Sequence, residues 1–328
     1  MCCEDDDPCA GKLDEFDAKL YGNYENKSGG IPTLMVDLSK SSQEINIKNN
    51  PTVTEQNGRI FFNYSGVTFK EGKSVYKIDT LITEKKNSEG CWILDDENKL
   101  NWSYSKSLDI VLVLDVSSSL GTNIDAVKTY ARAMVSKILT QNPLARIAIV
   151  KFSRGSVTFD FSSSESNLNQ FISQNSSYTS TDIGTYILEG RGETALYESV
   201  SVAVDLLSNS NSDGQGILTF TDGVSNYQID PQNQSSTPLI SKLKTTNISS
   251  YTIGFDGNQG SVDKSVLQEI AINGDFSFPK NLNELDSVFQ RYSNSVAAVY
   301  DLVYETNNAK LSNPIDYRFL FNTTQISP

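Results

Sequence analysis

The chain has 328 residues, 38% of them hydrophobic and 20% charged, a composition typical of folded globular proteins. A length prior of about 150 residues per domain predicts two domains. Acidic residues outnumber basic ones by 40 to 27, and the net charge of −13 argues against nucleic acid as a partner, because duplex binding needs clustered basic residues. The chain contains no histidine, which excludes histidine-based zinc sites and nucleophile–histidine pairs.

Residues 1–30 are polar and acidic, and we expect them to form a flexible tether. Cys2, followed by the acidic run 4–7, resembles the mature end of a bacterial lipoprotein, in which the cysteine after the cleaved signal is lipidated. The resemblance implies a lipid anchor on Cys2 as the only membrane contact, and a place in the bacterial cell envelope, at the outer membrane or cell surface. The alternative is an acidic tail with incidental cysteines. A disulfide between Cys9 and Cys91 is left open.

Residues 31–106 predict a small antiparallel β domain. Short segments rich in β-branched and aromatic residues alternate with Asn, Gly, Lys and Ser, as strands joined by turns do. We expect strands at residues 33–38, 45–48, 59–69, 75–83 and 91–94.

Residues 107–298 alternate between strand and helix patterns. This alternation predicts the α/β fold class: a doubly wound, mostly parallel sheet flanked by helices, similar to a Rossmann fold. The run 108–114 is apolar throughout and is expected to be a central strand buried on both faces. Further strands are expected at 146–152, 156–161, 216–220, 249–255 and 275–279, and helices at 124–139, 168–172, 194–207, 238–247, 261–274 and 281–299. The segments 174–192 and 224–237 are predicted to be polar loops.

Residues 299–328 return to a β pattern on both sides of Asn313-Pro314. They are either an extension of the α/β domain or strands that pair with the N-terminal β segments. We favour pairing, which makes the α/β domain an insertion in a sandwich-like all-β domain assembled from both ends of the chain.

Oxygen-bearing side chains follow the predicted strands at one edge of the sheet. Asp115, Ser117 and Ser119 come after the first strand, Thr194 precedes a helix, and Asp222 follows the strand 216–220. Open α/β sheets bind ligands at the carboxyl ends of their strands. Carboxylate and hydroxyl oxygens suit Mg²⁺, Mn²⁺ or Ca²⁺. The alternative is that these residues only cap helices and form turns.

The Asp-x-Ser-x-Ser, Thr and Asp-Gly elements, in this order, resemble the metal-ion-dependent adhesion site of von Willebrand factor A (integrin I-type) domains. The resemblance covers about residues 107–300. It implies a divalent cation, with Mg²⁺ expected first, held by Asp115, Ser117, Ser119, Thr194 and Asp222. It also implies an exchangeable position on the ion for an Asp or Glu carboxylate of a partner protein. Glu193 departs from the small residue of many members and adds a negative charge.

The resemblance favours a non-enzymatic, metal-dependent binding protein that acts in adhesion or assembly at a bacterial cell surface. The alternative is a periplasmic or intracellular scaffold subunit of a multiprotein complex. A metal-assisted hydrolase is disfavoured, because two acidic ligands without a histidine provide no evident general base. Partner contacts are predicted at Tyr178, Tyr186, Arg191 and Tyr227, since Tyr and Arg are typical interface anchors; ordinary solvated loops are the alternative. The partner and the oligomeric state are left open.

Overall fold

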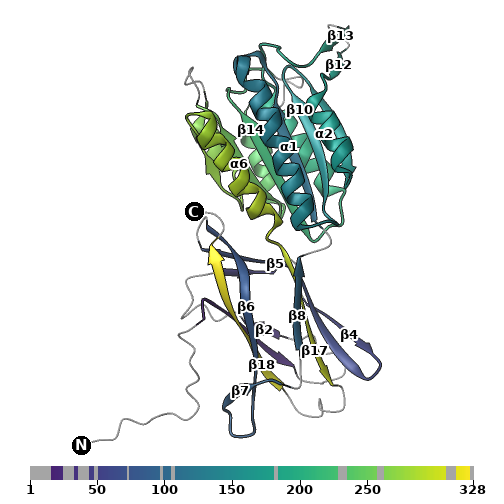
Figure 1. Ribbon diagram of the computed structural model, residues 1–328, viewed down its shortest axis with the longest axis vertical. Coiled ribbons are helices and arrows are strands. Elements are labelled where there is room, and N and C mark those ends of the chain that lie inside the picture. The colour runs from purple at the N-terminus through teal and green to yellow at the C-terminus, as the bar shows by residue number, and fades with distance from the viewer. Residues whose placement is uncertain are drawn as a thin grey trace, which may run out of the picture. The chain divides into compact units, whose positions relative to one another are not determined.

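The computed structural model describes residues 16–24, 33–35, 44–47, 51–71, 74–96, 99–104, 108–180, 184–227, 235–256, 262–307 and 315–325. The chain divides into two compact units (Figure 1). The first, here called the sandwich unit, combines Met1–Ser105 with Ala298–Pro328. The second, here called the α/β unit, is Lys106–Ala297. Among the described residues, no helix is both long and apolar enough to cross a membrane.

The sandwich unit is built from antiparallel strands in the order β2-β1-β18-β6-β5-β17-β8, with β3 and β4 paired to β5 and β7 paired to β6. These strands are β1 (Ala18–Tyr24), β2 (Thr33–Met35), β3 (Glu44–Asn46), β4 (Thr52–Gln56), β5 (Arg59–Glu71), β6 (Ser74–Lys86), β7 (Trp92–Leu94), β8 (Lys99–Tyr104), β17 (Tyr300–Asn307) and β18 (Ile315–Gln325).

Strand β5 belongs to both layers of the sandwich, the layer that contains β17 and β4 and the layer that contains β6 and β3. Its first part pairs with β17 and β4, and its last part pairs with β6 and β3. The register against β17 shifts beside Gly66, whose φ of 69° lies in the left-handed region. A glycine takes this conformation without a Cβ clash, so the strand can bend there and pass from one layer to the other.

The C-terminal strands complete the sandwich unit. Strand β17 lies between β5 and β8, with Tyr300 opposite Tyr104, and β18 lies between β1 and β6. Strand β1 falls within the segment 1–30 that the sequence suggested to be a tether, so the structure moves the start of the β region to Ala18. Among the residues of β1 whose burial is described, the inward positions are Ala18, Leu20 and Gly22, and so short an apolar alternation gives little strand signal.

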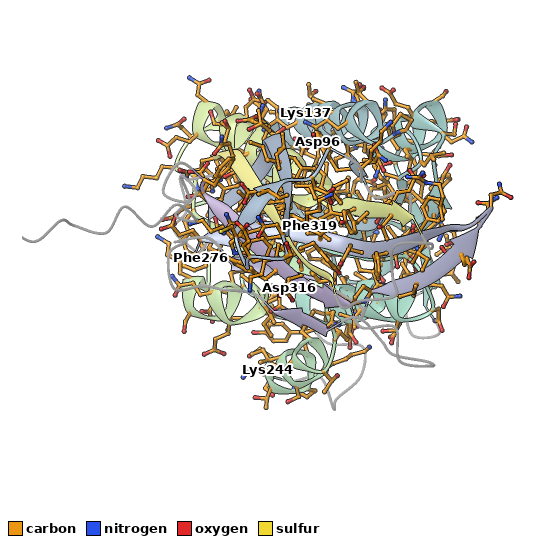
Figure 2. All side chains as sticks on the ribbon, turned by 90° about the horizontal axis from the view of Figure 1, so that it is seen from below. Asp96, Lys137, Lys244, Phe276, Asp316 and Phe319 are labelled. Atoms are coloured by element: carbon orange, nitrogen blue, oxygen red, sulfur yellow. The ribbon has the colours of Figure 1, made fainter. Side chains whose placement is uncertain are left out.

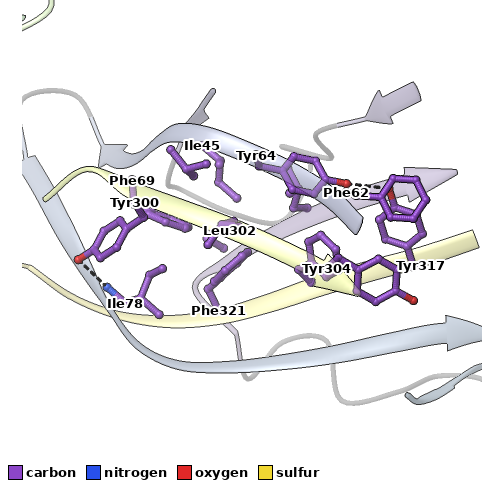
Figure 3. Packing of buried hydrophobic residues seen from close by; sticks show 14 of the residues in the cluster. Ile45, Phe62, Tyr64, Phe69, Ile78, Tyr300, Leu302, Tyr304, Tyr317 and Phe321 are labelled. Carbon is purple, nitrogen blue, oxygen red and sulfur yellow. Dashed lines mark hydrogen bonds between the residues drawn. The ribbon is translucent and has the colours of Figure 1, made fainter. Parts of the chain in front are cut away.

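Aromatic side chains from both layers fill the core of the sandwich unit (Figure 3). Tyr304 of β17 stacks on Tyr317 of β18, with ring centroids 4.8 Å apart, although these strands are not neighbours in the sheet order. The hydroxyl of Tyr317 shares a hydrogen bond of 2.7 Å with that of Tyr64 on β5. These contacts are therefore made face to face between the layers, and the buried hydroxyls satisfy each other.

The α/β unit contains a sheet in the order β11-β10-β9-β14-β15-β16, parallel except for β11. Its strands are β9 (Leu108–Asp115), β10 (Arg146–Phe152), β11 (Ser156–Ser162), β14 (Gly214–Thr221), β15 (Ser249–Gly254) and β16 (Phe276–Ser277). Its helices are η2 (Ser118–Asn123), α1 (Ile124–Gln141), α2 (Glu165–Ser173), α3 (Leu196–Ser208), α4 (Thr237–Lys244), α5 (Lys264–Ile270) and α6 (Leu282–Ala297). The predicted fold class, α/β with a mostly parallel sheet and an additional antiparallel region, is confirmed.

Helices cover both faces of this sheet. Helices α1, α2 and α6 pack together on one face, and α3, α4 and α5 on the other. In Figure 2, Lys137 of α1 and Lys244 of α4, one from each group of helices, lie on opposite sides of the view. Every residue of β9 is buried, as a strand between two covered faces requires.

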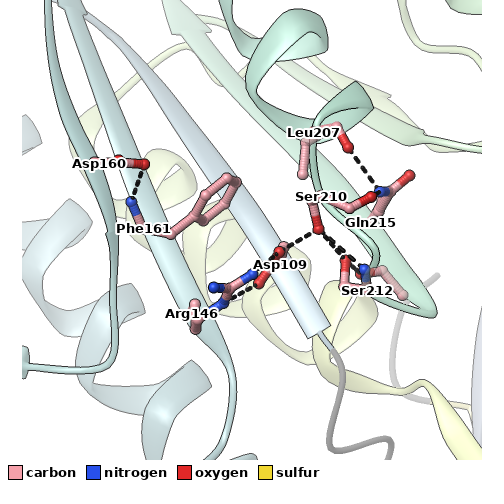
Figure 4. A network of polar contacts seen from close by, with 9 residues as sticks. Asp109, Arg146, Asp160, Phe161, Leu207, Ser210, Ser212 and Gln215 are labelled. Carbon is pink, nitrogen blue, oxygen red and sulfur yellow. Dashed lines mark hydrogen bonds and ion pairs between the residues drawn. The ribbon is translucent and has the colours of Figure 1, made fainter.

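A polar network fixes the amino-terminal edge of the sheet (Figure 4). Asp109 of β9 is buried and accepts two hydrogen bonds from the guanidinium of Arg146 on β10, at 2.9 and 2.6 Å. Ser210, which follows α3, donates to the same carboxylate. The charged groups thus pair at the edge opposite to the one where ligands bind in such sheets.

A two-stranded hairpin, β12 (Ser177–Ser180) and β13 (Gly184–Ile187), lies in the segment 174–192 that the sequence suggested to be a loop. Its base is fixed by the fully buried Lys151 of β10. The ammonium of Lys151 donates to Glu189 at 2.7 Å and to the carbonyl of Gln174 at 2.6 Å. Glu189 in turn accepts from the backbone N–H of Ser176 at 2.7 Å. One buried ion pair therefore holds both arms of the hairpin.

The Tyr64–Tyr317 hydrogen bond is expected to stabilise the sandwich unit. Tyr64→Phe leaves the Tyr317 hydroxyl buried without its partner and is expected to lower the free energy of unfolding by about 1–3 kcal/mol. The double variant with Tyr317→Phe is expected to lose less than the two single losses added, because no hydroxyl is left unpaired. Urea denaturation measures the difference, with Tyr130→Phe on α1 as the control. Strict additivity would contradict the coupling.

Breaking the buried ion pair at the base of the hairpin is expected to destabilise the α/β unit strongly. Lys151→Met leaves the Glu189 carboxylate without its counter-charge, which costs about 3–5 kcal/mol in comparable buried pairs. Adding Glu189→Gln removes the stranded charge and is expected to restore part of the loss. The exposed Lys244→Met is the control for charge alone. Equal denaturation midpoints for Lys151→Met and Lys244→Met would contradict this reading.

Candidate metal centre

Three segments bring their oxygen donors to the carboxyl edge of the sheet. Asp115 is the last residue of β9, and Asp222 directly follows β14. These strands are parallel neighbours, with Phe220 paired to Leu114, so they end side by side. Thr194 precedes α3, and its backbone carbonyl accepts from the N–H of Asn226 in the segment after β14. The edge rule that predicts ligand sites in open α/β sheets thus describes this arrangement.

Asp115 is fully buried, and both of its carboxylate oxygens accept hydrogen bonds from its own unit. The backbone N–H of Ser117 donates to Oδ1 at 2.9 Å, and the hydroxyl of Thr221 donates to Oδ2 at 2.6 Å. Burial, and after it the negative charge of Asp222, raise the pKa of Asp115 to about 6. Burial also raises the pKa of Asp222. Two carboxylates in this environment favour a nearby positive charge.

A chain of hydrogen bonds joins four of the five predicted ligands. The hydroxyl of Ser119 donates to Oδ1 of Asp222 at 2.7 Å. The hydroxyls of Ser117 and Ser119 lie 2.9 Å apart. Since Ser119 uses its only proton for Asp222, Ser117 is the donor between them. Together with the bond from the Ser117 backbone N–H to Asp115, these contacts join the four residues in one hydrogen-bonded network.

Thr194, the fifth predicted ligand, lies beside the same segment. It is buried, and its backbone N–H donates to the side-chain oxygen of Asn226 at 2.7 Å. A Cβ added to Gly223 would come within 3.4 Å of the Thr194 hydroxyl, so the hydroxyl faces the residue that follows Asp222. A larger residue at position 223 would crowd Thr194. Among the described residues, no hydrogen bond links Thr194 directly to the other four ligands.

The donor set fits a hard divalent cation. It offers two carboxylates and three hydroxyls, all oxygen, which is the chemistry that Mg²⁺, Mn²⁺ and Ca²⁺ prefer. The described residues contain no cluster of three or more His, Cys, Asp or Glu side chains. The centre is therefore a mixed carboxylate–hydroxyl site, and a bound cation would offset the charge that burial and mutual repulsion make unfavourable on the aspartates.

The predicted partner-contact residues gather beside this centre. Tyr178 and Tyr186 lie opposite each other on the hairpin, with ring centroids 5.5 Å apart. The guanidinium of Arg191 lies over the Tyr186 ring, 4.9 Å from its centroid. Tyr186 is only 7% exposed, because the hairpin packs on Val116. Val116 belongs to residues 116–119 directly after β9, here called the metal loop because they include Ser117 and Ser119. Tyr227 is part of the same group through Arg154, which was not among the predicted contact residues.

Arg154 follows β10 at the same edge of the sheet. Its guanidinium lies 4.7 Å from the centre of the Tyr227 ring and forms an ion pair of 3.3 Å with Glu193. The pairing counters the negative charge of Glu193 close to the centre. Applying the strand-edge rule to β10 as well as to β9 and β14 would have found Arg154. Asn226, which orients Thr194, carried no such signal.

The predicted lipidation site, Cys2, lies outside the described residues. Cys91 is disulfide-bonded. The other three cysteines of the chain, Cys2, Cys3 and Cys9, are all outside the described ranges.

Comparisons with known proteins address the family. The model of the von Willebrand factor type A domain family matches residues 109–291. A comparison with curated protein sequences found no match.

Several solved structures have a related fold. Proximal thread matrix protein 1 of the mussel byssus is 20% identical, with a TM-score of 0.44; the similarity covers 60% of this chain and 50% of that one, so the chain spans about half its length. A further structure of that protein has a zinc-occupied MIDAS motif. The vWF domain of the type V pili tip protein Mfa5 from Porphyromonas gingivalis is 13% identical, with a TM-score of 0.47 and coverages of 59% and 96%. The pilus adhesin SpaC from Lactobacillus rhamnosus GG is 11% identical, with a TM-score of 0.47 and coverages of 88% and 44%.

These structural likenesses are at low identity, and the family assignment comes from the sequence match alone. Because the matched region spans more than half of the chain, the protein belongs to the von Willebrand factor type A domain family.

Proposed function

We propose that this protein binds a partner protein through a divalent cation held at the carboxyl edge of the α/β sheet. The observation that carries the proposal is the hydrogen-bonded set of Asp115, Ser117, Ser119 and Asp222, with Thr194 beside it. Mg²⁺ is the ion that this oxygen set suits first, with Mn²⁺ and Ca²⁺ as further candidates.

The composition of the centre favours binding of an external carboxylate. Among the described residues, the proposed ligand set contains two carboxylates, Asp115 and Asp222, and its hydroxyl ligands are neutral, so the ion keeps much of its positive charge and its attraction for another anion. An Asp or Glu side chain of a partner supplies that anion. A single charge-based contact of this kind is strong and directional when it lies at the centre of an interface.

We propose that Tyr178, Tyr186, Arg191 and Tyr227 take part in the surrounding contacts. They gather on the hairpin and on the segment after β14, next to the loops that carry the ligands. Aromatic and arginine side chains are enriched at the centres of protein interfaces. The same segments expose Ile187 and Val224, which are 53% and 40% accessible.

We infer binding rather than catalysis. The chain has no histidine, and within the described part of the centre the two aspartates are assigned to the cation while the nearby Glu193 is paired with Arg154, so none of these carboxylates is available as a general base. The proposed role is adhesion or assembly.

We place the protein in the bacterial cell envelope, anchored by a lipid on Cys2. The disulfide at Cys91 supports an oxidising compartment, where such bonds persist, over an intracellular scaffold. A lipobox directly upstream of Cys2 in the genomic reading frame would support the anchor, and its absence would favour the scaffold.

Cation binding is expected to stabilise the protein through Asp115. Mg²⁺ at a hundred times its dissociation constant adds about 2.7 kcal/mol to the free energy of unfolding. Asp115→Asn keeps the shape of the side chain, and its oxygen still accepts from the Ser117 N–H, but its amide nitrogen donates to the Thr221 hydroxyl in place of accepting from it, and the charge is removed. We expect Mg²⁺ to raise the melting temperature of the wild type and not that of Asp115→Asn, with Asp205→Ala on α3 as the control.

The raised pKa of Asp115 gives a second check in EDTA. Ionising this carboxylate in the folded protein is unfavourable, so the wild type loses stability as the pH rises from the unfolded value near 4 through about 6. Asp115→Asn lacks this loss. We therefore expect the free energy of unfolding of Asp115→Asn, relative to that of the wild type, to increase as the pH rises over that interval. A difference that does not change with pH, together with equal responses to Mg²⁺, would refute the assignment.

Partner capture is expected to require the cation. The immobilised chain is exposed to bacterial or host extracts in Mg²⁺, and bound proteins are then released by EDTA. We expect the released proteins to be absent from the Asp115→Asn column and present on the Asp205→Ala column. Retention that ignores both EDTA and Asp115→Asn would rule out binding through the cation.

A further inference from the structure

Hydrogen-bond donors without acceptors gather beside the proposed cation site. The Tyr186 hydroxyl and Nε of Arg154 are buried, and within the described part of the chain neither has a hydrogen-bond partner. Nε of Arg191 donates to the carbonyl of Ile187 at 3.2 Å, but its exposed guanidinium forms no ion pair with the described acidic residues. We call Arg154, Tyr186 and Arg191 the donor cluster.

The donor cluster is one structural unit. Arg191 lies over the ring of Tyr186, and the Tyr186 hydroxyl lies within electrostatic reach of both arginines. The opposite hairpin residue, Tyr178, packs against the backbone of Gly155, next to Arg154: a Cβ on that glycine would lie 2.7 Å from the Tyr178 ring. The cluster therefore combines β10, the hairpin and the segment after it.

Backbone hydrogen bonds tie the cluster to the metal loop. The N–H of Ser118, between two predicted ligands, donates to the carbonyl of Arg191 at 2.7 Å. The N–H of Gly190 donates to the carbonyl of Val116 at 2.8 Å. With the base of the hairpin also held by Lys151 and Glu189, Arg191 has a fixed place relative to the loop that carries Ser117 and Ser119.

The cluster is rich in donors and positive charge but poor in acceptors. Glu193 pairs with only one terminal nitrogen of Arg154. Buried donors without acceptors are unfavourable, and a guanidinium is best satisfied by a carboxylate, which can accept two parallel hydrogen bonds. In a chain of net charge −13, an exposed arginine that forms no ion pair with the described acidic residues selects for an anion.

We propose that the partner is an acidic protein segment with two carboxylates, one for the cation and a second for the donor cluster, with Arg191 as its outer contact. Exposed Ile187 and Val224 fit an apolar side chain in the same segment. This inference rests on the proposed function, since the first carboxylate binds through the cation. It adds that a single acidic residue is not enough for full affinity.

Short random peptides displayed on phage test the proposal. The library is bound to the full chain in Mg²⁺ and released with EDTA. Peptides recovered on the wild type are expected to share two acidic residues at a recurring spacing. Peptides recovered on Arg191→Gln are expected to keep one acidic residue and to lose the spacing.

One recovered peptide is then synthesised with both acidic residues and with the second replaced by Gln. We expect Arg191→Gln to weaken binding of the first peptide about tenfold or more, which is the scale of a charge-assisted contact, and to leave the second unchanged. Arg191→Lys keeps the charge without the paired donors, and its affinity for the first peptide is expected to lie between those of the wild type and Arg191→Gln. Arg132→Gln on α1 is the matched control and is expected to bind like the wild type.

The outcomes separate this inference from the proposed function. Peptides that EDTA releases but that carry only one acidic residue, or that bind Arg191→Gln as well as the wild type, would overturn the second carboxylate alone. If EDTA releases no peptide from the wild type, binding through the cation fails and this inference fails with it.

Discussion

The constraint on which the functional edge depends is a carboxylate buried at the end of a buried strand. Asp115 closes β9, and its two oxygens accept from two different segments, Ser117 in the metal loop and Thr221 at the end of β14. Both segments are thus shaped around one charge that water does not reach. Without a counter-charge this arrangement is costly, as the raised pKa of Asp115 indicates. A bound cation would offset that cost, because the hydrogen bonds already hold the proposed ligands in place.

Within the α/β unit, the charged groups that stabilise the fold differ in their hydrogen bonding from the groups beside the proposed cation site. Two charged pairs stabilise the fold, Asp109 with Arg146 and Lys151 with Glu189. In each pair one side chain, Asp109 or Lys151, is buried, and the two partners are hydrogen-bonded to each other. Groups at and beside the hairpin are hydrogen-bonded only in part: the Tyr186 hydroxyl and Nε of Arg154 have no partner within the described part of the chain. The buried ion pairs therefore hold the α/β unit in place, and the hairpin and its neighbouring segments carry the groups proposed to bind a partner.

The sequence predicted the fold class, which the structure confirms, and it suggested the local part of the proposed site. The all-apolar run of β9 and the ligands Asp115, Ser117 and Ser119 lie within one short segment, so their spacing can be seen directly. Asp222 and Thr194 required one further rule, that neighbouring parallel strands end at the same edge. The structure brings four of these five into one chain of hydrogen bonds and puts Thr194 beside them.

What the sequence did not carry depends on contacts between distant residues. Thr221 acts on Asp115 only because its hydroxyl points across to β9, and Asn226 acts on Thr194 across 32 residues. The hairpin was missed because its strands are short and polar, and its stability comes from Lys151 and Val116 elsewhere in the chain. Strand β1 was missed for a similar reason, since its partner β18 lies at the other end of the sequence.

The pairing of β8 with β17 determines how a force on the α/β unit enters the sandwich unit. The chain leaves the sandwich unit through β8 and returns through β17, and Tyr104 lies directly opposite Tyr300 in adjacent antiparallel strands. Tension applied at the cation edge reaches the sandwich through both strands at the same end. Each strand then takes a share of the force, and the ladder between them is not pulled apart. The load passes on to β5, so the resistance of the sandwich unit rests on β17–β5 hydrogen bonds that act together.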